Sequence, residues 1–151
     1  MRLRVKDELL SDTQQLCPSA QPDWKRASAI GVIGGTANEP RVGYLANTLA
    51  VTDEILTLSD PVTPTEVFRF AAPCVRAGCV HFEDSACRLA TRIVKLLPTV
   101  TERLPKCAVR SECRWWLQEG KAACLRCPQV VTDNYNPSDR MRQAADPASQ
   151  I

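Results

Sequence analysis

The chain has 151 residues, 44% of them hydrophobic, and its 19 lysines and arginines against 17 aspartates and glutamates give a formal net charge of +2. This size fits one ordinary domain with a buried core. The charges are mixed in sign without a basic block, so no nucleic-acid partner is expected. No stretch approaches the roughly 18 apolar residues that span a bilayer, and the start of the chain lacks the apolar run of a signal peptide. We therefore expect a cytoplasmic protein with no membrane partner.

The first part of the chain predicts a small β element. We expect a flexible arm over residues 1–15, followed by a single domain over 16–132 whose first part, 16–60, is this β element. The runs ASAIGVIGGT (27–36) and RVGYLAN (41–47) are apolar and contain β-branched residues, and ANEP separates them, which predicts two strands joined by a turn. A proline-rich connection follows, with one extended piece at 67–71.

The cysteine-rich part, residues 74–132, predicts two helices. In DSACRLATRIVKLLP, Asp84 or Ser85 is placed to cap a helix and Pro98 ends it. Its apolar face consists of Leu89, Ile93, Leu96 and Leu97. Ser111 is placed to cap a second helix beginning ECRWWLQEG, and the polar residues 133–151 predict a flexible tail. The fold expected is α+β, with the N-terminal β element packed on a cysteine-rich helical part that binds metal.

Eight cysteines are the most unusual feature of the composition. In the reducing cytosol, clustered cysteines bind metal or do redox chemistry more often than they form disulfides. Eight are enough for two four-thiolate sites, which would change the net charge from +2 to about −2 if each held a divalent ion or an oxidised four-iron cluster. The ligands we predict are Cys74, Cys79, Cys87, Cys107, Cys113, Cys124 and Cys127, with Cys17, far upstream, as the eighth.

Helical geometry limits how these cysteines group. Cys113 and Cys124 are eleven residues apart, which is roughly 16 Å of rise on one continuous helix. Sulfurs that far apart cannot share one metal centre. Either Gly120 ends the helix and Cys124 folds back, which we favour, or Cys113 and the Cys124–Cys127 pair belong to different sites.

The spacing favours iron–sulfur ligation over zinc. Structural zinc sites usually present paired CxxC motifs, whereas this chain has one, Cys124-x2-Cys127, and its other gaps are irregular. Proline adjoins Cys17, Cys74 and Cys127, and proline keeps a loop out of helix so that it can wrap a cluster. We therefore predict one or two [4Fe–4S] clusters, with zinc as the alternative.

Residues around the cysteines fit an anionic centre. Cys87 falls in the first turn of its helix, where the helix dipole favours a thiolate. Nearby arginines either balance the charge of such a centre or form a solvated face: Arg76, Arg88, Arg110, Arg114 and Arg126. Phe82, Trp115 and Trp116 can screen a cluster from water, although the tryptophans are also explained as core residues.

Other motifs point away from catalysis. A thioredoxin-like role for Cys124–Cys127 needs the pair to follow a strand, but a helix is expected before it. His81 is the sole histidine, so a hydrolytic triad is not credible, and a loop or helix-capping histidine explains it better than a ligand does. The run GVIGGT lacks the lysine and the spacing of a phosphate-binding loop.

Long stretches of the chain resemble a known family. The segments CPSAQPDW, PTEVFRFAAPC and LPKCAVRSECRWWLQEGKAACLRCPQVVTDNYNPS are similar to those of small cysteine-rich cyanobacterial proteins commonly labelled "nitrogen fixation protein". The resemblance covers roughly residues 16–139. It implies a bacterial cytosol and a link to iron–sulfur or nitrogen metabolism.

Three classes of function follow from these observations. The first is an iron–sulfur protein that passes electrons to a redox or regulatory partner protein or senses redox state. The second is a zinc-stabilised module, without catalysis, that docks a partner through its tryptophans. The third, an enzyme, needs an open coordination position, which three cysteines with His81 would supply, but nothing else in the sequence supports it.

Overall fold

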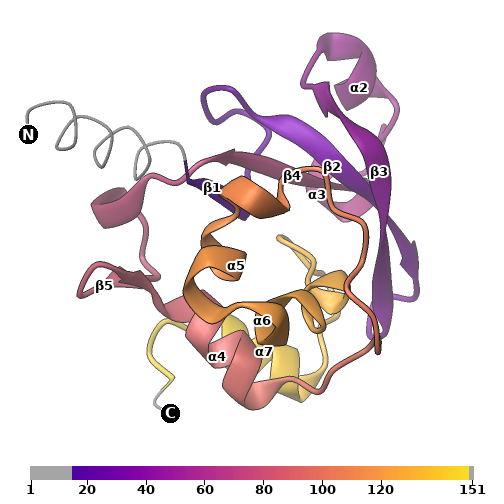
Figure 1. The fold of residues 1–151 in the computed structure, drawn as a ribbon. Coiled ribbons are helices and arrows are strands. Elements are labelled where there is room, and N and C mark those ends of the chain that lie inside the picture. The colour runs from indigo at the N-terminus through magenta and orange to yellow at the C-terminus, as the bar shows by residue number, and fades with distance from the viewer. Residues whose placement is uncertain (1–14, 150–151) are drawn as a thin grey trace, which may run out of the picture.

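The computed structural model describes residues 15–149 (Figure 1). Apart from Gln15, the predicted flexible arm lies outside the described residues. The strands are β1 (Leu16–Ala20), β2 (Ser28–Gly35), β3 (Pro40–Ala50), β4 (Phe68–Pro73), β5 (Phe82–Glu83) and β6 (Ala86–Cys87). The α-helices are α2 (Asp53–Thr57), α3 (Pro64–Val67), α4 (Arg88–Leu96), α5 (Arg114–Glu119), α6 (Lys121–Cys124) and α7 (Asp139–Ala145). Short 3₁₀ turns are η1 (Arg76–Gly78), η2 (Arg110–Glu112) and η3 (Cys127–Gln129).

An antiparallel sheet with strand order β1-β4-β2-β3 forms one layer of the molecule. The two predicted strands are confirmed as β2 and β3, and the predicted extended piece is β4. The turn between β2 and β3 needs a glycine, because Gly35 has a φ of 76° and an added Cβ would lie 2.4 Å from the Glu39 carbonyl oxygen. The register of β1 on β4 places Cys17 opposite Ala72, two residues before Cys74.

The helices α4, α5, α6 and α7 gather in a second layer beside the sheet (Figure 1). Together with the sheet they form the mixed α+β fold expected from the sequence. The main core lies in this layer, where Ile93, Trp115, Ala123 and Val130 are buried together. Beneath the sheet the core is made of smaller groups around Phe70, Ala72 and Ile30.

Both predicted helices exist, but their caps differ from the prediction. Asp84 and Ser85 have φ values of 52° and 63° because they form the two-residue turn of the β5–β6 hairpin, and two positive φ angles are typical of such a turn. The cap of α4 is instead Cys87. Ser111 lies within η2, and the cap of α5 is Cys113.

The predicted flexible tail over 133–151 is wrong for its middle part. Ser138 caps α7 by accepting a hydrogen bond from the Met141 backbone N–H at 3.1 Å. Met141 and Ala144 of α7 are buried in the main core, where α7 packs on α4. The polar residues between them hid this helix in the sequence, since only two of its side chains face inward. Residues 150–151 lie outside the described part of the chain.

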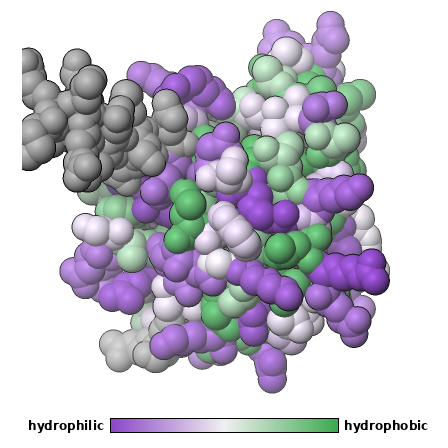
Figure 2. Space-filling view, in the orientation of Figure 1, coloured by the Kyte–Doolittle hydropathy of each residue, from purple (hydrophilic) through white to green (hydrophobic). Residues whose placement is uncertain are grey.

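Over residues 15–149, none of the helices has both the length and the apolar character needed to cross a bilayer. On the face drawn in Figure 2, hydrophobic side chains form separate patches divided by hydrophilic ones.

Candidate metal centres

The eight cysteines gather in two groups of four. Site 1 consists of Cys17, Cys74, Cys79 and Cys87, which line a cavity of about 270 Å³. Site 2 consists of Cys107, Cys113, Cys124 and Cys127, which line a second cavity of about 20 Å³. Burial raises the pKa of Cys17 and Cys87 in site 1 and of Cys107, Cys113 and Cys124 in site 2, and neighbouring thiolates of the same site add to the rise. All eight cysteines are free thiols.

Strand pairing brings the isolated Cys17 into site 1. Cys17 lies on β1, and the Cys74 backbone N–H donates to the Gln15 carbonyl oxygen at 2.9 Å, which holds the two chain segments side by side. The loop around η1 then carries Cys79, and the β5–β6 hairpin returns the chain to Cys87.

A break at Gly120 assembles site 2. Gly120 has φ 69° and ψ −148°, a conformation that is essentially restricted to glycine, and it separates α5 from α6. The predicted end of the helix at Gly120 is therefore confirmed. Because the chain turns there, Cys124 and Cys127 meet Cys107 and Cys113 at one cavity, a grouping that the sequence had left open.

Backbone N–H groups point at the sulfurs of both sites. The Arg76 and His81 N–H groups donate to the Cys74 and Cys79 sulfurs, each at 3.4 Å. The Ser19 and Val109 N–H groups donate to Cys17 and Cys107 in the same way, two residues further along the chain. Donors arranged around a sulfur stabilise its anionic form, because hydrogen bonds to charged acceptors are stronger than those to neutral ones.

Each site has one cysteine at the N-terminus of a helix. Burial raises the pKa of the Cys87 and Cys113 thiols, and the nearby N–H groups of Leu89 and Ala90 in α4 and of Trp115 and Trp116 in α5 act against that rise, although neither sulfur makes a cap hydrogen bond. These N–H groups have no partner within their own helix. The two sites thus use the same local device, a cysteine followed by an arginine at the first position of a helix.

A wholly buried arginine contacts site 2. Arg69 of β4 is 0% exposed, and its Nη2 donates to the Cys127 sulfur at 3.0 Å. Its other donors reach the carbonyl oxygens of Pro18 at 2.7 Å, Val130 at 2.7 Å and Cys127 at 3.0 Å. Within residues 15–149, no carboxylate lies within ion-pair distance of Arg69. A buried cation needs a counter-charge, and the Cys127 thiolate is the group in contact that can supply it.

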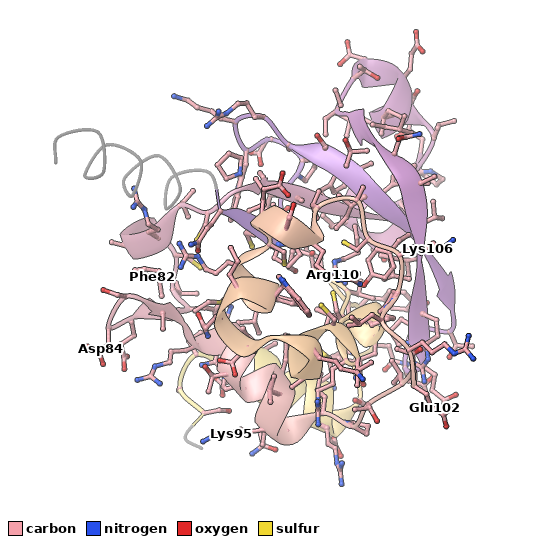
Figure 3. All side chains as sticks on the ribbon, viewed as in Figure 1. Phe82, Asp84, Lys95, Glu102, Lys106 and Arg110 are labelled. Atoms are coloured by element: carbon pink, nitrogen blue, oxygen red, sulfur yellow. The ribbon has the colours of Figure 1, made fainter. Side chains whose placement is uncertain are left out.

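Two further donors lie at the wall of site 2. Arg110 hydrogen-bonds the Cys124 sulfur and lies in the middle of the molecule, with sulfur atoms close by in the view of Figure 3. Its Nε and the Tyr44 hydroxyl are both buried and have no hydrogen-bond partner among the described residues. Both residues line the cavity, so an acceptor placed inside it would satisfy them.

Burial keeps these thiols protonated when no cation is nearby. It raises the pKa of Cys17 and of Cys113 to about 12, and it also raises the pKa of Cys87, Cys107 and Cys124. A bound metal reverses this preference, because its positive charge stabilises the thiolate. Filling either site therefore releases protons.

The sulfurs that line each cavity are not placed as the ligands of one metal ion are. In residues 15–149, no three or more histidine, cysteine, aspartate and glutamate side chains form a group that could hold a single metal ion.

Of the remaining residues singled out from the sequence, His81 lies at site 1 and Arg88 does not. His81 lines site 1, but its Nδ1 accepts from Arg92 Nη2 at 2.6 Å, and burial together with this arginine lowers its pKa. Arg88 pairs with Glu83 and Asp84 at 3.6 Å on the hairpin instead of reaching a sulfur.

The other predicted arginines and aromatic residues lie close to the sites. Arg114 and Phe82 line site 1, with the guanidinium 5.2 Å from the ring centroid. Arg126 donates to the Leu97 carbonyl oxygen at 2.8 Å. Trp115, 1% exposed, lines site 2, and Trp116 stacks on Arg110.

Sequence reasoning missed three residues that shape the sites. Tyr44 lies on a strand far from any cysteine in the chain, and Arg69, although close to Cys74 in sequence, contacts Cys127 from another part of the chain, so spacing gave no signal. Gln118 of α5 holds Cys87 through both of its backbone groups, with two bonds of 2.8 Å. An arginine within the apolar run VFRFAA was the one available hint, because a buried strand rarely contains a charge without a partner.

Comparison with protein-family models, curated proteins and solved structures gives no match to this chain.

Proposed function

We propose that this chain is a cytoplasmic iron–sulfur protein that holds a [4Fe–4S] cluster at each of its two sites and carries electrons between partner proteins. The observation that carries the proposal is the arrangement of the sulfurs. They gather in two groups of four, and the Cys74, Cys79 and Cys127 sulfurs accept hydrogen bonds from backbone N–H groups or from an arginine.

The residues fit such a group better than they fit one zinc ion. In a four-iron cluster each thiolate binds a different iron, so its four ligands stand further apart than the ligands of a single ion. The buried Tyr44 hydroxyl and Arg110 Nε would find acceptors in the sulfides of a cluster. When bound, the cluster supplies a one-electron couple, while the protein binds its irons, shields them with Trp115 and Phe82, and balances their negative charge.

Site 1 is the place where a redox partner would exchange electrons. The segment around η1 that carries Cys74 and Cys79 also presents Val75 and Val80, which are 46% and 76% exposed. Apolar side chains at the rim of a redox centre favour a short-lived contact with another protein. The resemblance to cyanobacterial proteins extends this proposal to electron supply in nitrogen fixation, which stays a prediction.

The test is to purify the full chain without oxygen and to measure iron, sulfide and zinc. We expect about eight irons and eight sulfides per chain, in a brown protein whose visible absorption bleaches when dithionite is added. A colourless protein with about two zinc ions per chain would instead establish the zinc-stabilised interaction module and would overturn the proposal.

A further inference from the structure

Sites 1 and 2 are built back to back. Consecutive residues line opposite cavities, because Cys17 lies at site 1 and Pro18 at site 2. Leu16 forms a bridge with Cys113 of site 2. A bridge partner is about 5 Å away and the next residue along the chain about 3.8 Å further, so the Cα atoms of Cys17 and Cys113 lie within about 9 Å.

Arg69 links the two sites directly. Its Nε donates to the Pro18 carbonyl oxygen, next to Cys17 of site 1, at 2.7 Å. Its Nη2 donates to the Cys127 sulfur of site 2 at 3.0 Å. The guanidinium also lies 5.7 Å from the ring centroid of Trp115, which lines site 2. One side chain therefore spans the wall between the sites and touches the sulfur of one of them.

The two sites differ in the charge of their donors. At site 2, the Arg69 guanidinium donates to the Cys127 sulfur at 3.0 Å, and Arg110 lines the same cavity. At site 1, the Cys74 and Cys79 sulfurs accept from backbone N–H groups, and the guanidinium of Arg114 at the cavity wall lies over the Phe82 ring. A positive charge in contact with a ligand stabilises the reduced, more negative state of a centre, and burial keeps water and salt from screening it.

Resting on the proposed function, we infer that Arg69 makes site 2 the more easily reduced of the two centres, so that electrons run from site 1 to site 2. One electron enters site 1 from a one-electron donor protein. The electron then passes to site 2, so that site 1 returns to its oxidised state. From site 2 the electron leaves to a one-electron acceptor protein. Water in the larger cavity of site 1 acts in the opposite direction, but it is weaker than a wholly buried guanidinium that donates directly to a sulfur.

The test is an anaerobic redox titration of the full chain, followed by electron paramagnetic resonance. Two variants assign the signals, since Cys79→Ala removes site 1 and Cys124→Ala removes site 2. We expect Cys124→Ala to keep only the lower-potential signal and Cys79→Ala to keep only the higher one. The reverse assignment, or two centres of equal potential, would overturn the inference.

Arg69→Met then tests the cause. It should lower the potential of site 2 by at least the equivalent of a tenfold change in the one-electron equilibrium, which is 59 mV, and leave site 1 in place. The matched control Arg41→Met removes an exposed arginine bonded to the Pro40 carbonyl oxygen and should move neither signal.

A second variant keeps the test decisive if Arg69→Met does not fold. Arg110→Met removes a half-buried arginine at the Cys124 sulfur and should lower the same signal. If the potential of site 2 is unchanged in the variants that fold, its higher value is not due to these arginines. A wild-type protein without reducible iron is recognised from the iron content before any titration, and it overturns the proposed function together with this inference.

Discussion

Sites 1 and 2 each gather four cysteines around one N-terminal helix residue, but they surround them differently. Site 1 encloses about 270 Å³ and its sulfurs accept from backbone N–H groups, whereas site 2 encloses about 20 Å³ and two arginines contact its sulfurs. Each site has one buried cysteine and three half-buried ones, so the exposure of the cysteines does not separate the sites. The size of the cavity and the charge of the groups around the sulfurs are what set the two centres apart.

The largest loss of stability is expected for Trp115, which lines site 2 and is buried in the main core. Trp115→Ala removes a side chain that is 1% exposed and should lower the free energy of unfolding by about 3–5 kcal/mol. The control Trp116→Ala, at a half-buried position on the same helix, should cost clearly less. Anaerobic urea unfolding of the metal-loaded protein measures both values. Equal losses would show that Trp115 is not a central packing residue.

The second prediction compares one glycine of the backbone at each site. Gly120→Ala should cost about 1–3 kcal/mol, because φ is 69° there while an added Cβ meets no atom within 4 Å, so the cost is conformational. Iron should be lost from site 2 in preference to site 1. Gly78→Ala, in the η1 turn of site 1, places its Cβ 3.7 Å from Val75 and should change stability by less than about 0.5 kcal/mol. An alanine at position 120 without effect would contradict the role of the break.

The apo protein should lose stability in alkaline solution. Burial raises the pKa of Cys17 of site 1 and Cys113 of site 2 to about 12 in the folded protein, against an ordinary thiol value of 9.0. Above pH 9 the unfolded chain therefore binds fewer protons than the folded one. Its free energy of unfolding falls by up to about 1.4 kcal/mol per pH unit for each such thiol until the folded pKa is passed. Denaturant titrations of the reduced apo protein between pH 8 and pH 10 measure the slope, and a flat profile would reject buried neutral thiols.

The smallest effect tests how one site depends on the other. Gln118 lies on α5, the helix that begins at Cys113 of site 2, yet it bonds both backbone groups of Cys87 in site 1. Gln118→Leu should cost about 1 kcal/mol and speed the release of iron from site 1 to a chelator. Gln129→Leu, which loses a bond to the Pro98 carbonyl oxygen, is the control and should leave that rate in place. Faster release from site 2 alone would contradict this coupling.

The sequence predicted the local features well. Apolar runs and glycine turns located β2, β3 and β4, and helical geometry predicted the break at Gly120, while the grouping of the cysteines stayed open. These features depend on neighbours in the chain or on the rise of a helix, so they can be derived from spacing alone.

Spacing alone could not predict the contacts between distant parts of the chain. Cys17 reaches Cys74 through the register of β1 on β4, and Arg69 reaches Cys127 across the wall between the sites. Nothing in local spacing records which strands pair. The helix α7 was missed for a related reason, because its burial rests on Met141 and Ala144 meeting α4, a contact that becomes visible only in the folded chain.

The most direct test of two separate iron–sulfur sites is the iron content of Cys79→Ala, Cys124→Ala and the double variant, each purified without oxygen beside the wild type. The account predicts about eight irons per chain in the wild type, about four in each single variant and none in the double variant. A single variant that loses all of its iron, or one that keeps the wild-type amount, would contradict the division of the cysteines into sites 1 and 2.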